Sequence, residues 1–89
     1  MNFVAIIGIV ENLTESTLND NRTLCIKVEK ISQDHTDADW YDIVNVNLDK
    51  EMFQQEINNI SRGCIIGIKG RIKFINEQMH LIGERVQVF

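Results

Sequence analysis

Eighty-nine residues, of which 44% are hydrophobic and 25% charged, indicate a single folded domain and exclude multidomain enzymes and disordered chains. The net charge of −4 argues against a protein that coats nucleic acid or anionic membranes through bulk charge. The charge is uneven: residues 1–56 hold four basic and eleven acidic residues, whereas residues 57–89 hold five basic and two acidic ones. The C-terminal third is therefore locally cationic and can position a polyanion.

Targeting features are not expected in this sequence. The longest apolar runs, residues 3–10 and 64–68, are much shorter than the roughly 20 residues that span a bilayer. The N-terminus has neither the basic region nor the cleavage site of a signal peptide. The two cysteines, Cys25 and Cys64, lie in apolar patterns and fit reduced, buried thiols better than a disulfide. We therefore expect a cytoplasmic protein without a membrane partner.

Three strands are predicted in the first half of the chain. Phe3–Leu13 is apolar on both parities, that is, at odd-numbered and at even-numbered positions, whose side chains face opposite sides of a strand. This is typical of a strand that is covered on two sides. Residues 24–28 and 41–48 alternate with a period of two, which is typical of strands with one face inward. The polar residues 15–21 and 32–39 are expected to form a turn and a hairpin loop.

A helix and two further strands are predicted in the second half. Asp49 can cap a helix of about three turns, in which apolar residues recur at helical spacing until Gly63 ends it. Residues 64–75 alternate cleanly and predict the fourth strand. Residues 76–78 predict a short turn before the last strand, Met79–Phe89.

The predicted order is β-β-β-α-β-β, which is the order of the OB-fold, a five-stranded Greek-key barrel. The expected fold class is thus all-β with one helix. Another small β-barrel, or an open five-stranded sheet with a helix on one face, satisfies the same strand count. Glycines inside the strand patterns are expected to mark bulges or sharp bends of a small barrel. These glycines are Gly8, Gly67, Gly70 and Gly83.

Basic side chains in the fourth strand are the first candidate binding residues. Lys69, Arg71 and Lys73 recur at a spacing of two, so they project from one face about 6–7 Å apart, close to the repeat of phosphates along a single strand. A solvated strand face that merely keeps the protein soluble is the alternative interpretation. Arg22 and Lys27, in or beside the second strand, widen this surface if they share it.

Aromatic residues are the second group of candidates. Trp40 and Tyr41 are adjacent, so their side chains point to opposite faces, and a base could stack on whichever ring lies outside. Trp40 shares its parity with the more apolar positions of the strand, which favours Trp40 as the buried ring. A bulge near Asp42 would instead bury Tyr41 and expose Trp40. Alternatively, both rings pack at the rim of the barrel. Phe74 shares the parity of Ile72 and is expected in the core unless the hairpin tip lets it swing outward.

No catalytic, cofactor or metal site is expected. His35 lies in an acidic loop but has no second histidine or cysteine at ligand spacing, and His80 is interpreted as a structural or surface residue. There is no recognisable nucleophile and base arrangement and no glycine-rich phosphate loop before a helix. An enzyme is therefore not expected.

Two sequence blocks carry a resemblance to a known family. Residues 40–44 read Trp-Tyr-Asp-Ile-Val, and residues 62–72, after the predicted helix, read Arg-Gly-Cys-Ile-Ile-Gly-Ile-Lys-Gly-Arg-Ile. Together with the opening strand, Phe3–Leu13, these blocks resemble the bacterial single-stranded DNA-binding protein family over nearly the whole chain. The resemblance implies an OB-fold that binds single-stranded DNA with little sequence preference, by aromatic stacking and phosphate contacts. It also implies a homo-oligomer and a role in DNA replication, recombination or repair.

Individual residues match the family pattern unequally. Trp40 matches a family stacking position, and Arg71 falls on the basic fourth strand. Asp42 stands where the family is often basic, and Val46 stands where it often has a stacking aromatic, so we expect a reduced platform. We expect the family's acidic C-terminal tail to be missing, because the sequence closes with Gln87-Val88-Phe89, and in this the chain resembles the short primosomal replication protein relatives.

Two functions of different classes follow from these observations. The leading hypothesis is non-catalytic binding of single-stranded DNA through Trp40, Lys69, Arg71 and Lys73. The alternative is an OB-fold that docks on replication or repair proteins and binds nucleic acid weakly or not at all, which the net charge favours. An RNA-binding module is a third interpretation. A homodimer or tetramer is expected, because the first strand and the C-terminus are more apolar than an isolated barrel of this size needs.

Overall fold

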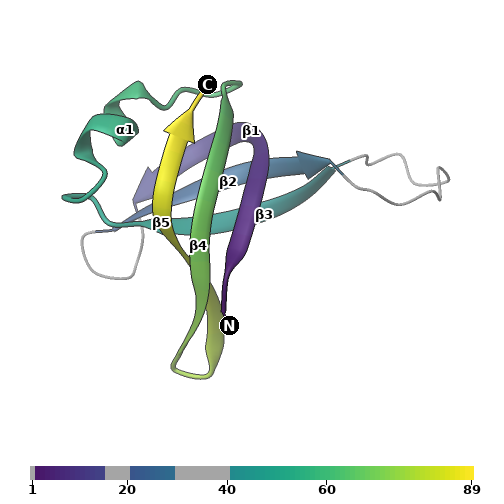
Figure 1. Ribbon diagram of the computed structural model, residues 1–89, viewed down its shortest axis with the longest axis vertical. Coiled ribbons are helices and arrows are strands. Elements are labelled where there is room, and N and C mark those ends of the chain that lie inside the picture. Colours follow the sequence, from purple (N-terminus) through teal and green to yellow (C-terminus); the bar gives the residue numbers. More distant parts are fainter. Residues whose placement is uncertain (1, 16–20, 30–40) are drawn as a thin grey trace, which may run out of the picture.

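The computed structural model describes residues 2–15, 21–29 and 41–89. The five strands close into a barrel in the order β1-β2-β3-β5-β4, and one short helix lies between β3 and β4 (Figure 1). This confirms the predicted OB-fold and excludes the open sheet. The elements are β1 (Val4–Glu15), β2 (Arg22–Glu29), β3 (Tyr41–Leu48), α1 (Gln54–Asn59), β4 (Ile65–Ile75) and β5 (Gln78–Val88).

β1 closes the barrel because it pairs with two strands in succession. Its first half pairs antiparallel with β4 and its second half with β2, and Ile9 belongs to both ladders. At this corner the backbones approach closely: a Cβ on Gly8 would lie 2.4 Å from both Ile26 Cγ2 and the carbonyl oxygen of Lys27. Only glycine fits there, as the glycine pattern predicts for a sharp bend.

The core fills the barrel interior with side chains from alternate strand positions. β2 and β3 contribute pairs of residues on the inward parity, and Phe53, in the turn before α1, is also buried. Close packing of such branched side chains is the main favourable term in the stability of a domain this small. The buried apolar residues are Val10, Leu24, Ile26, Val46, Leu48, Phe53, Ile66 and Ile68.

The helix is shorter than predicted. Asp49 accepts hydrogen bonds from the backbone N–H groups of Glu51 (2.9 Å) and Met52 (3.1 Å), but these cap a turn, and α1 itself begins only at Gln54. None of the α1 residues is buried, so little apolar packing supports a longer helix. Gly63, at a φ of +90°, lies in the turn that leads into β4.

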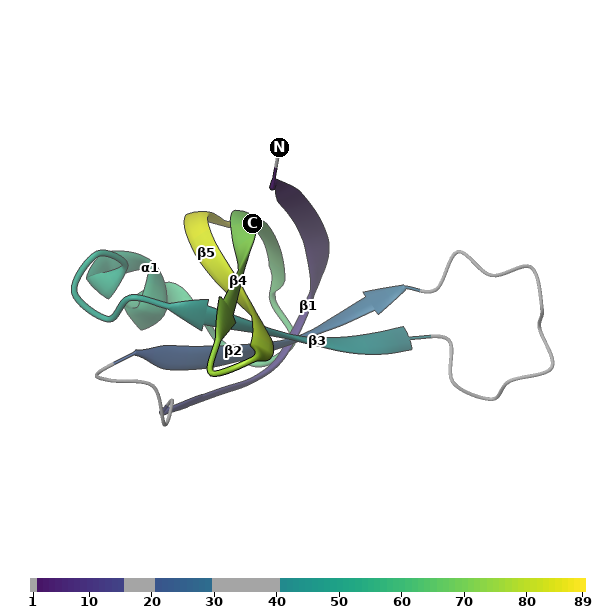
Figure 2. The same cartoon turned by 90° about the horizontal axis from the view of Figure 1, so that it is seen from below.

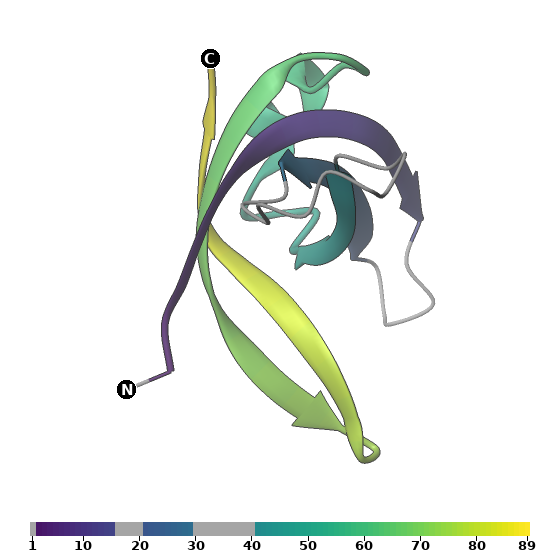
Figure 3. The same ribbon diagram turned by 90° about the vertical axis from the view of Figure 1, so that its right-hand side faces the viewer.

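The β4–β5 hairpin extends beyond the barrel (Figures 1 and 3). Its turn has two central residues, Asn76 and Glu77, both with positive φ, which matches the twist of the flanking strands. β5 therefore starts at Gln78, one residue earlier than predicted. β2 and β3 also extend from the barrel, on the side away from α1 (Figure 2).

Candidate nucleic-acid interface

The cations of β4 lie on its outer face. Lys69, Arg71 and Lys73 are exposed and have the parity opposite to that of the buried Ile66 and Ile68. This confirms their predicted alignment; we call these three residues the cationic stripe.

The three cations of the stripe differ in their surroundings. Arg71 is paired with Glu84, with its Nη2 2.7 Å and its Nε 3.0 Å from Glu84 Oε2. Lys69 lies opposite Arg85, whereas Lys73 lies opposite His80. Within the described part of the chain, neither lysine has an ion-pair partner. Lys69 and Lys73 are thus available for an anion, and Arg71 is partly neutralised.

A line of polar side chains connects the hairpin to the outer face of β2 and β3. Lys73 pairs with His80 across the hairpin, and His80 Nδ1 lies 3.5 Å from Asn47 Nδ2. The Thr23 hydroxyl donates to Asn47 Oδ1 at 3.4 Å. We call Lys73, His80, Asn47 and Thr23 the polar row. It crosses β4, β5, β3 and β2, and so joins the β4–β5 hairpin to the strand face on which OB-folds bind oligonucleotides.

The two other predicted cations do not extend the stripe. Lys27 lies on the outer face of β2, but its Nζ is 3.1 Å from Glu11 Oε2. Arg22 has the parity of the buried Leu24 and pairs with Leu48, so Arg22 and Lys27 do not share a face of β2. Around the barrel, β2 is separated from β4 by β1 on one side and by β3 and β5 on the other. The condition under which Arg22 and Lys27 would widen the basic surface is therefore not met.

Tyr41 is the outward-facing aromatic of β3. It is 45% exposed, lies opposite Glu29 and shares the outer parity with Ile43. The β2–β3 ladder is continuous as far as Tyr41, so the bulge considered near Asp42 is not there. Trp40 lies outside the described residues, as does the loop that contains His35.

Phe74 does not enter the core. It is 74% exposed, and its cross-strand partner Met79 is 65% exposed. Both lie on the inward parity, but they are two residues from the turn at Asn76 and Glu77, and no core covers them there. Phe74 therefore faces away from Lys73, and of the two placements that the sequence left open, the exposed one near the hairpin tip is observed.

Sequence reasoning missed most of the polar row. Counting pairs outward from the turn at Asn76 and Glu77 would have placed His80 opposite Lys73. No comparable pattern indicates the contact of Asn47 with β5, which depends on a parallel β3–β5 pairing between residues far apart in sequence.

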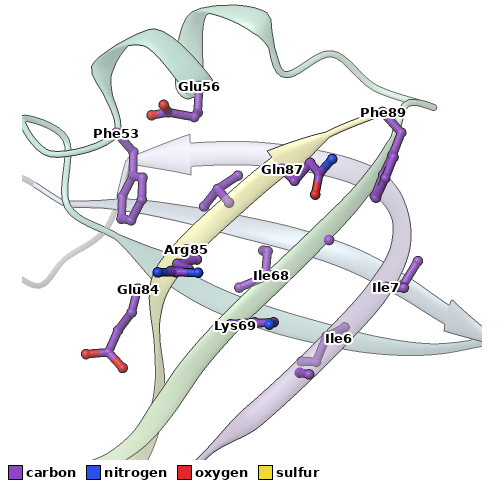
Figure 4. A pocket seen from close by; sticks show the side chains of 13 residues that line it. Ile6, Ile7, Phe53, Glu56, Ile68, Lys69, Glu84, Arg85, Gln87 and Phe89 are labelled. Atoms are coloured by element: carbon purple, nitrogen blue, oxygen red, sulfur yellow. The ribbon is translucent and has the colours of Figure 1, made fainter.

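A second surface, at the opposite end of β4 from the hairpin turn, is apolar. Ile7, Ile65 and Phe89 are 68%, 51% and 64% exposed, and with Ile9 they form what we call the apolar outer face. The Phe89 ring lies over Gly67, where an added Cβ would be 3.2 Å from Phe89 Cε2. A groove of about 500 Å³ runs beside this face. Figure 4 shows its side chains, which include Phe53, Glu56, Lys69, Arg85 and Phe89.

The described residues form neither a metal-binding cluster nor a membrane-spanning helix. No group of three or more histidine, cysteine or carboxylate residues among them could hold a metal ion. Their helices are too short and polar for any to span a membrane. Cys25 and Cys64 are free thiols, and both are half-buried rather than buried.

Comparisons with known proteins connect this geometry to a fold. No protein-family model matches the chain, and no curated protein is significantly similar to it in sequence. Solved structures do match. The dimeric N-terminal domain of PriB from Thermoanaerobacter tencongensis has a TM-score of 0.72 at 15% identity, covering 99% of this chain and 96% of that one.

Two further matches have similar scores. The mitochondrial single-stranded DNA-binding protein Rim1 of S. cerevisiae has a TM-score of 0.73 at 12% identity, covering 98% of this chain and 92% of that one. A small single-stranded DNA-binding protein of Mycoplasma pneumoniae has a TM-score of 0.70 at 12% identity, with the same coverage. The chain thus has the fold of the proteins that its sequence blocks resemble.

Proposed function

We propose that this protein is a non-catalytic, cytoplasmic single-stranded DNA-binding protein that acts in DNA replication, recombination or repair. One observation carries the proposal: the polar row joins the cation-bearing face of the β4–β5 hairpin to the outer face of β2 and β3. On an OB-fold, this is the surface that oligonucleotides cross. The likeness to structures of single-stranded DNA-binding proteins supports it.

Each part of the surface has a distinct role in the proposed binding. Lys73 and Lys69 neutralise phosphates, and Arg71 contributes after it is released from Glu84. Tyr41 offers a ring on which a base can stack, and Trp40 is the second proposed stacking residue. Phe74 lies on the opposite face of the hairpin, so a strand that reaches it must wrap around the tip. Because Arg71 and Lys27 are ion-paired, we expect modest affinity.

The test is titration of a fluorescently labelled oligo-dT by anisotropy at several salt concentrations. The Arg71→Ala/Lys73→Ala variant should lose most of the affinity and show a shallower dependence on salt, by about 0.7 in log–log slope per lost phosphate contact. The matched control is Lys50→Ala/Arg62→Ala, which removes the same charge from exposed positions outside the polar row. Equal affinity of the two double variants would contradict the proposal.

The apolar outer face favours a second candidate function, docking on a replication or repair protein. Exposed apolar side chains gathered on one face of a barrel often mark an interaction site. The same titration separates the candidates: if the intact protein does not change the anisotropy of oligo-dT even at low salt, the docking function is favoured. The apolar face is not needed for phosphate contacts, so both functions are compatible with one chain.

We also propose that the protein is a homo-oligomer assembled through the apolar outer face. Ile9 lies directly opposite Ile65 on β4, and Ile7 lies on the same outer face of β1. Among the described residues the first half of β1 pairs with β4 alone, so its other edge can receive a second copy. Size-exclusion chromatography with light scattering should give a dimer or tetramer mass. A clean monomer mass would remove this proposal.

A further inference from the structure

We propose that His80 is a phosphate-binding residue at the centre of the polar row and that protonation of its ring tightens nucleic-acid binding. The inference rests on the proposed function and adds to it a residue that lies outside the cationic stripe. Its expected signature is an affinity for single-stranded DNA that depends on pH near neutrality.

His80 lies among cations and neutral polar groups. Lys73 is directly opposite on β4, and Arg71, the next outer-face residue of β4, is already paired with Glu84 of β5. β3 presents the Asn47 amide, and β2 presents the Thr23 hydroxyl behind it. Within the described ranges, His80 has no carboxylate partner. Protonated His80 and Lys73 therefore place two positive charges side by side, and a bound phosphate would relieve their repulsion.

The hydrogen bonds around His80 can be satisfied in both protonation states. In the structure, Asn47 Oδ1 accepts from Thr23, so Nδ2 is the amide atom beside His80 Nδ1, and the neutral ring carries its hydrogen on Nε2. After protonation, Nδ1 also becomes a donor. Turning the Asn47 amide over presents Oδ1 to the ring and Nδ2 to the Thr23 hydroxyl, which can accept as well as donate.

This arrangement leaves one ring nitrogen for a ligand. Nδ1 is held by Asn47 in either state, whereas Nε2 has no partner among the described residues. A neutral ring donates an ordinary hydrogen bond from Nε2–H, and a protonated ring donates a charge-assisted one, which is roughly twice as strong. Histidine normally changes its charge between about pH 5 and pH 8. Affinity should thus be highest near pH 5.5 and fall as the pH rises to 8, by about fivefold.

The experiment measures the affinity of the full chain for labelled oligo-dT by anisotropy between pH 5.5 and 8 at constant ionic strength. The His80→Gln variant should bind with the weaker affinity at every pH, and the His80→Lys variant should bind tightly at every pH. The matched control is His35→Gln, which removes the other of the two histidines and should keep the pH dependence of the parent. The salt dependence of the parent should be steeper at pH 5.5, by about 0.7 in log–log slope.

Two results would overturn the inference while leaving the proposed function intact: parent binding that does not change with pH, or pH dependence that persists in His80→Gln. Absence of binding at any pH would overturn both. Should the variants fail to fold, as judged by circular dichroism, NMR of the parent decides. Adding oligo-dT at about pH 6.5 should move the His80 ring resonances toward their protonated positions, and unmoved resonances would refute the contact.

Discussion

Two outer surfaces of the same barrel differ sharply in chemistry. The polar row carries hydrogen-bonded amide, hydroxyl and imidazole groups together with Lys73, which has no ion-pair partner in the described part of the chain. The apolar outer face carries isoleucine side chains and a C-terminal phenylalanine that are half or more exposed at three of its four positions. Both surfaces are built from the outward parity of strands whose inward parity fills one common core.

The strand β4 contributes to both surfaces and shows how the difference arises. Its first residue, Ile65, belongs to the apolar outer face, and Lys73, eight positions later on the same parity, belongs to the polar row. β4 has 11 residues and extends past the end of the barrel. Because β4 is longer than the barrel, it contributes to both surfaces: to the apolar outer face where it covers the core, and to the polar row where it forms the projecting hairpin.

The largest expected effect comes from the common core. Ile66→Ala removes a fully buried side chain and should lower the free energy of unfolding by roughly 2–5 kcal/mol. Its neighbour Ile65 is 51% exposed, so Ile65→Ala should cost much less in the monomer. Urea unfolding at low protein concentration measures both. Similar losses for the two variants would mean that Ile65 is as important to the core as Ile66.

The next effect separates assembly from nucleic-acid binding. Ile7→Glu places a charge on the apolar outer face, and two-fold symmetry would place two charges in one interface, so we expect self-association to weaken by about a hundredfold or more. Light scattering over a dilution series measures this change. Per-chain affinity for a short oligonucleotide should be nearly unchanged. Unaltered oligomer mass in Ile7→Glu would place the interface elsewhere.

Two exposed aromatic residues test which face of the molecule the nucleic acid crosses. Tyr41 shares the outer parity of β3 with Asn47, whereas Phe74 faces away from Lys73. Tyr41→Ala should cost about 1–3 kcal/mol of binding free energy, the usual range for one stacked base, and Phe74→Ala should cost less. Anisotropy titration of each variant with oligo-dT compares them. If Phe74→Ala has the larger effect, the strand crosses the opposite face of the hairpin.

The smallest expected effect on binding comes from releasing Arg71, the cation that is paired with Glu84. Glu84→Gln removes the charge that holds Arg71 and should tighten oligo-dT binding by about two- to threefold at low salt. The gain should fade as salt is raised, because exposed charges are screened. Lys50→Ala, in the turn before α1, should leave affinity nearly unchanged. Weaker binding by Glu84→Gln would show that the ion pair positions Arg71 for a phosphate.

Local sequence patterns alone determined the elements and their faces. A period of two in β4 placed Lys69, Arg71 and Lys73 on one face, and this alignment is observed. The order of three strands, a helix and two strands indicated the OB-fold, because alternation and turn residues are local properties of the chain. The helix was predicted too long, because its spacing pattern does not show that Phe53 is buried in the core while α1 contributes only the partly buried Ile57.

The tertiary structure alone decided which of these residues meet. Asn47 and His80 are 33 positions apart in the sequence and are brought together by the parallel β3–β5 pairing, which no local pattern encodes. Likewise, the core expected for Phe74 ends where the hairpin leaves the barrel. The physical reason is the same in both cases: periodicity fixes the face on which a side chain lies, whereas barrel closure fixes what lies beside it.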